Sequence, residues 1–304
     1  MPHAPPTITI RSKPEEEFPV PVFQSIRSGA RHPETRDFRA LHSPGKVRLA
    51  ACLAILCALT IAAPHHATAA EQPSSLKISS GIDYTSGDYG TGSDTQIVTI
   101  PTAAKFYSGP WMLGLTVPII HVDGNAGVLG GTDGTVVVKK GVTGRRQQGG
   151  LGDIVGSGGY TFFLDSKDMP LIDLIGKIKF PTAEDDLGTG EFDFSIQTDI
   201  AKAIGRFTPF GTLGYRFVGG SGLNDIFFLS FGASYKLNEQ WNAGLIFDYR
   251  QSTSDQTDDP AEFTPFAAWA FHKDWSLMGY GVIGATDGSP DYGGGIQVAY
   301  TLDL

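Results

Sequence analysis

Apolar and polar residues alternate over much of the chain, in segments of about ten residues separated by Gly, Asp, Ser and Asn. In the last segment, Ile296, Val298 and Tyr300 share one face, while Gln297 and Thr301 share the other. A period of two residues is that of an extended strand, because successive side chains of a strand point to opposite faces. The alternation therefore predicts β-strands that each have one apolar face and one polar face.

Twelve such segments can be counted: 75–85, 95–107, 111–121, 150–164, 170–180, 191–201, 207–218, 226–236, 241–250, 262–271, 275–285 and 293–304. The connections alternate between long or Gly/Asp-rich stretches, such as 86–94 and 122–149, and tight turns, such as 108–110 and 273–274. Short turns at one end and long loops at the other are typical of outer-membrane barrels, which have an even number of strands. We predict an all-β fold: a transmembrane antiparallel β-barrel of about twelve strands, with short periplasmic turns and long extracellular loops. A soluble two-sheet sandwich would also alternate, but it would not require this rhythm of connections.

Aromatic residues recur at the predicted strand ends. Trp111, Trp241 and Trp275 each follow a short turn directly, which places all three at one rim of the barrel. Indole rings prefer the boundary between hydrocarbon and water, where the ring is buried and its N–H stays wet. The tryptophans therefore predict the membrane boundary at the short-turn end.

The N-terminal region has the features of an export signal. Lys46 and Arg48 precede an uncharged apolar run over 49–63, and Ala67-Thr68-Ala69 follows as a small-x-small cleavage pattern. We predict a signal peptide over 46–69, cleaved near Ala69 or Ala70, with 70–304 forming the barrel in the cell outer membrane. A membrane anchor is the alternative, although the run is shorter than the roughly 20 residues that span a bilayer.

Residues 1–45 show no hydrophobic period and are too long for an ordinary leader tip. They are interpreted either as an extended leader, which makes 1–69 one leader region, or as the result of a mis-assigned translation start. Both cysteines, Cys52 and Cys57, lie within the leader, so the exported part has no disulfide framework.

The polar strand faces would point into the barrel and supply its chemistry. By alternation they carry these residues: Lys77, Asp83, Lys105, Asp153, Ser157, Asp173, Lys177, Lys179, Asp193, Gln197, Asp199, Arg216, Asn242, Asp248 and Arg250. The candidates for lining a solute path are Lys177, Lys179, Asp193, Arg216, Asp248 and Arg250. We expect Lys177 and Lys179 to face Asp193 on the neighbouring strand.

Two functions remain open on this pattern. In the first, the barrel is an outer-membrane channel or transporter for passive uptake of small solutes, and its charged residues set the selectivity. Alternatively, opposite charges pair across the lumen and plug it, leaving a structural or adhesive barrel that acts through its loops.

The long loop 122–149 contains Lys139, Lys140, Arg145 and Arg146, the clustered basic residues of the exported part. We predict that this loop folds over or into the mouth as a constriction, where its charges would attract anionic solutes or lipopolysaccharide phosphates.

Other functional classes are disfavoured. His121 and His272 fall at opposite ends of the barrel, so they cannot form one metal site or a histidine-based catalytic site, and no catalytic residue, metal or cofactor is predicted. The net charge of −9 and the absence of a basic stripe argue against nucleic acid. The expected partners are outer-membrane lipid and lipopolysaccharide, a small-molecule solute, and the barrel-assembly machinery during insertion.

Three short motifs carry a family resemblance: Gly150-Leu151-Gly152-Asp153-Ile154, the strand end Lys179-Phe180-Pro181-Thr182-Ala183, and the loop Leu187-Gly188-Thr189-Gly190. They resemble the Gram-negative outer-membrane family labelled "putative MetA-pathway of phenol degradation", often called simply transporter. The resemblance covers about 80–304, with Ala183 standing where the family has Gly. It implies outer-membrane passage of aromatic or other hydrophobic compounds and defines no catalytic residue.

Overall fold

The computed structural model describes residues 74–304 except 131–135, 140–141, 143, 164–168 and 185–186. The predicted leader, 1–69, lies outside the described residues. Within the described part of the chain, no helix is long and apolar enough to cross a membrane.

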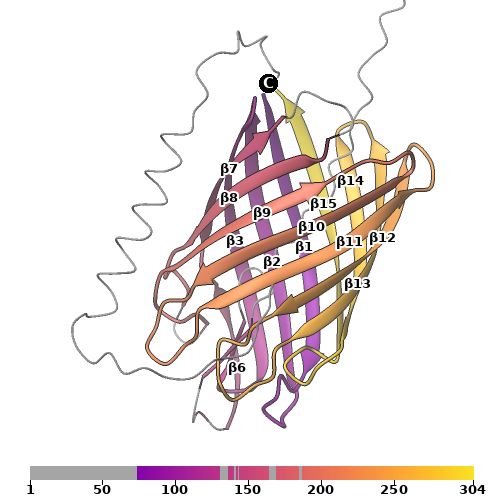
Figure 1. The fold of residues 1–304 in the computed structure, drawn as a ribbon. Helices are drawn as coiled ribbons and strands as arrows, with labels where there is room; N and C mark the ends of the chain where they lie inside the picture. Colours follow the sequence, from indigo (N-terminus) through magenta and orange to yellow (C-terminus); the bar gives the residue numbers. More distant parts are fainter. Residues whose placement is uncertain (1–73, 131–135, 140–141, 143, 164–168, 185–186) are drawn as a thin grey trace, which may run out of the picture.

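The described chain is built from strands, and each pairs antiparallel with its neighbours (Figure 1). In chain order they are β1 (Ser75–Gly87), β2 (Thr95–Ser108), β3 (Trp111–Asn125), β4 (Val128–Gly130), β5 (Val136–Val138), β6 (Arg145–Leu151), β7 (Val155–Phe162), β8 (Leu171–Lys179), β9 (Asp193–Ala201), β10 (Phe207–Phe217), β11 (Ile226–Lys236), β12 (Trp241–Arg250), β13 (Ala261–His272), β14 (Trp275–Gly284) and β15 (Tyr292–Asp303). All except β4 and β5 belong to one 13-stranded sheet.

The large sheet closes on itself. β1 pairs with β2 on one side and with β15 on the other, and β2 pairs with β3, so the sheet forms a continuous ring, in which β6 pairs with β3. β6 and β7 both pair with β3, in successive halves of a single wall position, so the 13 strands fill twelve positions around the wall. The predicted twelve-stranded barrel is confirmed.

The fourth predicted strand and the loop before it differ most from the prediction. The fourth segment, expected as 150–164, is interrupted at 152–154 and starts five residues earlier, with β6 at Arg145. At the interruption the Gly152 amide donates to the Pro118 carbonyl of β3 (3.0 Å), which holds the two halves against the same neighbour. β3 and β6 therefore extend the wall into the region that the sequence assigned to a loop.

The two faces of the wall have opposite character. Leu113, Ile283 and Ile296 point outward and are 63%, 56% and 55% exposed, while Gln197, Ser230 and Thr264 point inward and are buried. A closed barrel satisfies its backbone groups within its own wall, which leaves an apolar outer face free to meet lipid.

Aromatic rings line the short-turn end of this outer face. Trp111 packs edge-on against Tyr160 with centroids 4.9 Å apart, Trp241 stacks on Trp269 at 5.3 Å, and Trp275 contacts Tyr300 at 4.8 Å. The rings span several neighbouring strands and mark a membrane boundary at this end.

Candidate functional site in the barrel interior

The six candidate lumen residues all lie on the wall that runs from β8 to β12. Lys177, Asp193, Arg216, Asp248 and Arg250 are only 3% to 9% exposed, and the side chain of Lys179 is 14% exposed. They alternate along their strands with outward apolar residues, so their charges face the interior. Their role as a solute path remains a prediction.

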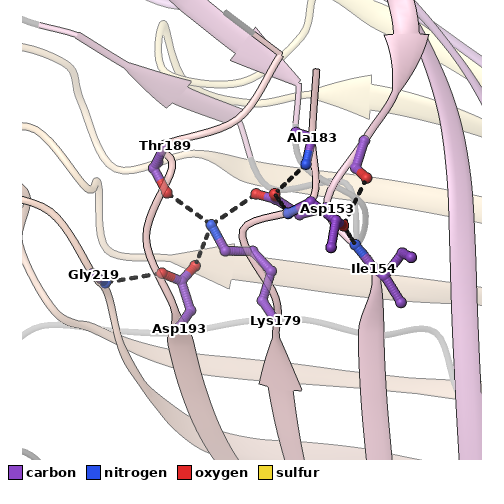
Figure 2. Close-up of polar contacts among 9 residues, drawn as sticks. Asp153, Ile154, Lys179, Ala183, Thr189, Asp193 and Gly219 are labelled. Atoms are coloured by element: carbon purple, nitrogen blue, oxygen red, sulfur yellow. Dashed lines mark hydrogen bonds and ion pairs between the residues drawn. The ribbon is translucent and has the colours of Figure 1, made fainter. Parts of the chain in front are cut away.

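Lys179 sits between two carboxylates at the long-loop end of the wall. Its Nζ lies 3.0 Å from Asp153 Oδ2 and 3.2 Å from Asp193 Oδ2, and it donates to Thr189 Oγ1 at 2.9 Å (Figure 2). Lys179 and Asp193 are directly paired across β8 and β9, as the sequence predicted. Lys177 lies two residues before Lys179 on the same face, so its partner in the antiparallel strand lies two residues after Asp193 and is Ser195.

The family-like motifs meet at this same point. Asp153 Oδ1 accepts the backbone N–H groups of Thr182 (3.1 Å) and Ala183 (3.0 Å), while the hydroxyl of Thr182 accepts the Ile154 amide at 2.8 Å (Figure 2). Asp193 Oδ1 accepts the Gly219 amide at 2.8 Å, which ties down the next long loop. We call Asp153, Lys179 and Asp193 the charged bracket. It fixes the loops at the mouth of the barrel.

A Cβ on Gly188 would stand 2.7 Å from the Cβ of Ala183 and 2.8 Å from Asp153 Oδ2. Glycine at this position of the third motif lets its loop approach the charged bracket closely. The short motifs are therefore explained by packing around Asp153.

Arg250 forms a second interior ion pair further around the wall. Its Nη2 lies 2.8 Å from Glu262 Oε1, and both side chains are largely buried. Asp248 is directly paired with Glu262 across β12 and β13. Glu262 was not among the predicted interior residues. The alternation of 262–271 could have assigned it to the inward face.

An apolar cluster fills the interior at the long-loop end. It consists of Tyr89, Ile97, Ile120, Val122, Val128 and Leu187, with Val136, Val138 and Ala183 packed against it. We call this set the mouth cluster. Tyr89 is 1% exposed and adopts a φ of 51°, which non-glycine residues seldom do, and burial raises the pKa of its hydroxyl above the usual range.

The four basic residues of the predicted constriction lie in different settings, and the constriction itself stays a prediction. Arg145 and Arg146 belong to strand β6, where Arg145 is 64% exposed and pairs with Asp123 at 2.9 Å. Arg146 donates to the carbonyl of Val128 at 3.2 Å and so ties β4 to the wall. Lys139 lies just after β5, and Lys140 lies outside the described residues. The most deeply buried residues of 122–149 are apolar and include Val122, Val128 and Leu129, because burying a charged side chain is far more costly than burying a valine.

A closed antiparallel barrel with a lipid-facing apolar surface, an aromatic rim and a charged interior defines an outer-membrane β-barrel protein. A family model described as "Putative MetA-pathway of phenol degradation" matches residues 81–302. The chain belongs to this family, as the motifs indicated.

A solved structure shares the fold at low sequence identity. The COG4313 outer membrane channel from Pseudomonas putida F1 is 11% identical, with a TM-score of 0.55 over 79% of this chain and 100% of that chain. The translocator domain of the autotransporter NalP from Neisseria meningitidis is 9% identical, with a TM-score of 0.46 over 84% of this chain and 96% of that chain. A search of curated proteins found no match.

Proposed function

We propose that the protein is an outer-membrane channel that lets small solutes cross passively. The observation that carries this proposal is the row of charged side chains on the inward face of β8 to β12. Charged groups are expensive to bury unless they meet partners or water, and the interior of a wider barrel is the place where they meet both. Twelve strands enclose more room than the eight-stranded barrels that side chains fill completely.

Aromatic or hydrophobic compounds are the solute class that we favour. The description of the family refers to phenol degradation. The mouth cluster fills the end of the barrel where the loops lie, so a ring-bearing solute would have to pass apolar side chains such as Ile97, Ile120 and Leu187 to reach the charged wall. Apolar surfaces with a few placed polar groups are typical of sites for such ligands.

The experiment is single-channel recording of the full-length expressed protein, purified from outer membranes, in planar bilayers, with benzoate added to one side. We expect discrete conductance steps that benzoate reduces. Silence from protein that migrates as a folded barrel on an unheated gel would refute the proposal.

A plugged barrel that acts through its loops is the second candidate. The low exposure of the interior charges and the depth at which Val128 and Leu187 are packed favour it. A silent barrel that binds lipopolysaccharide or cell surfaces through 219–225 or 251–261 would establish this alternative.

A further inference from the structure

Two carboxylates face the interior side by side near the short-turn end of β8 and β9. Asp173 and Asp199 are directly paired across the two strands. Asp199 Oδ1 accepts hydrogen bonds from Gln197 Nε2 and Thr212 Oγ1, both at 2.7 Å, whereas its Oδ2 has no partner among the described residues. Asp173 Oδ1 and Gln197 Oε1 likewise have none in the described part of the chain.

These orphaned oxygens are deeply placed. Gln197 is 2% exposed and Asp199 is 6% exposed, and the amide of Gln197 lies against the Asp199 carboxylate. Buried acceptors without protein donors are rare, and each one calls for a donor from elsewhere, such as water, a cation or a ligand. We call Asp173, Gln197 and Asp199 the acceptor patch.

Two lysines are paired in the same manner on another part of the wall. Lys77 of β1 and Lys105 of β2 are directly opposite one another on the inward face. Neither ammonium group forms a hydrogen bond or ion pair with any residue that the structure describes. The side chain of Lys105 lies over Gly114, where its Cγ would be 3.4 Å from an added Cβ.

The lysine pair and the acceptor patch interact electrostatically across the interior. β3, β7 and β8 separate β2 from β9 in the wall, yet the Lys105 ammonium and the Asp199 carboxylate are close enough to interact electrostatically. Lys177, on the neighbouring strand β8, also interacts electrostatically with Asp199. Lys105 of the lysine pair therefore faces Asp199 of the acceptor patch across the lumen, with Lys77 and Asp173 as their strand neighbours.

Each pair by itself is unfavourable, because like charges at directly opposite strand positions destabilise the pairing. Their separation across the lumen produces an electric field perpendicular to the barrel axis. A solute with a hydrogen-bond-donating cationic group and an anionic group would satisfy the orphaned oxygens and the lysines together.

We propose that the acceptor patch and the Lys77–Lys105 pair form a subsite for small zwitterionic solutes, with the ammonium group on Asp173 and Asp199 and the carboxylate on the two lysines. This inference deepens the proposed channel function, because it names what the short-turn end of the solute path selects.

Three compounds with the same ring separate the contributions: phenylalanine carries both charges, phenethylamine only the positive one, and 3-phenylpropionate only the negative one. Binding to the detergent-solubilised full-length protein is measured by titration calorimetry, which does not require conduction. We expect phenylalanine to bind most tightly.

The double variant Asp173→Asn/Asp199→Asn should weaken the binding of phenylalanine and of phenethylamine by about tenfold each, the size of one charge-assisted hydrogen bond. It should leave the binding of 3-phenylpropionate unchanged. Lys77→Gln/Lys105→Gln should weaken phenylalanine and phenylpropionate and spare phenethylamine.

Asn keeps the shape of Asp, and Gln removes the charge of Lys while staying polar. Asp94→Asn and Lys273→Gln remove the same charges from exposed sites outside the lumen as controls. Equal binding of the three compounds by the wild-type barrel, or equal losses in both double variants, would overturn the subsite. Bilayer recordings of the same samples decide the channel function separately. A barrel that binds the compounds in the expected order but never conducts would support the subsite and refute the channel. A barrel that conducts but does not show this order would support the channel and refute the subsite.

Discussion

The two ends of the β8–β9 hairpin carry similar residues in opposite conditions. At the long-loop end, Lys179 lies between Asp153 and Asp193, and their remaining oxygens accept backbone amides. At the short-turn end, Asp173 and Asp199 lie side by side with oxygens that no described residue donates to. Charges that satisfy one another hold a structure together, whereas charges left with unused acceptors are suited to a ligand. Burial alone would not have separated the two cases.

Removing the centre of the charged bracket should have the largest effect on stability. Lys179→Met leaves Asp153 and Asp193 buried without their shared cation, which should lower the free energy of unfolding by about 3–5 kcal/mol. The measurement is the urea midpoint for loss of the folded band on an unheated gel. Lys179→Arg, which keeps the charge, is the matched control, and an unchanged midpoint for Lys179→Met would contradict the structural role.

The mouth cluster should respond next. Leu187→Ala removes a nearly fully buried side chain, which should destabilise the barrel by about 2–5 kcal/mol. It should also raise single-channel conductance, because the cluster fills the end of the lumen through which solutes would enter. Leu237→Ala, at an exposed position in a short turn, is the control. A variant with reduced stability but unchanged conductance would place the cluster outside the path.

Asp153→Asn should have a smaller effect. The amide retains a carbonyl oxygen for the Thr182 and Ala183 amides but loses the charge that Lys179 contacts, so we expect a loss of about 1–3 kcal/mol. Limited proteolysis should then cut within 181–190 sooner than in the wild-type protein. Cleavage that is accelerated equally at 251–261 would indicate a global effect instead.

Asp199→Asn tests the opposite end of the comparison and should change stability least. It relieves the repulsion from Asp173 and keeps an oxygen for Thr212 and Gln197, so the urea midpoint should stay level or rise slightly. A fall as large as that of Lys179→Met would mean that both ends of the hairpin are structural.

Much of the wall could be predicted from the sequence because the period of two is imposed by lipid on one side and water on the other. The same period assigned Lys179 and Asp193 to one face at facing ends of neighbouring strands, and the structure pairs them. It failed for β6, whose residues from Arg145 to Gly150 have no apolar outward face. The alternation signal disappears where the outward face is polar.

The mouth cluster could not be predicted for a different reason. β4 and β5 have three residues each, too few to show any period, and Leu187 lies alone among acidic and glycine residues. Their burial depends on Tyr89, Ile97 and Ile120, which are distant in sequence. The unused oxygens of Asp173 and Asp199 were equally invisible, since alternation gives the direction of a side chain and not its partners.

The pairing of β1 with β15 has a consequence for how the protein is made. Its register runs from Ser75↔Asp303 to Ser86↔Tyr292, so it joins the two ends of the described chain, whereas the other wall strands pair with strands that are near in sequence. Neighbouring strands can pair one after another as local hairpins. The β1–β15 pairing can form only once the last strand is present, and closing so long a loop costs more entropy. Until then two long edges with unpaired backbone groups are open to aggregation. An assembling barrel therefore needs its first strand kept from other chains until the last strand arrives. Because the two ends of the described chain are adjacent, a circular permutation that joins them at this seam and opens another turn should keep the ring.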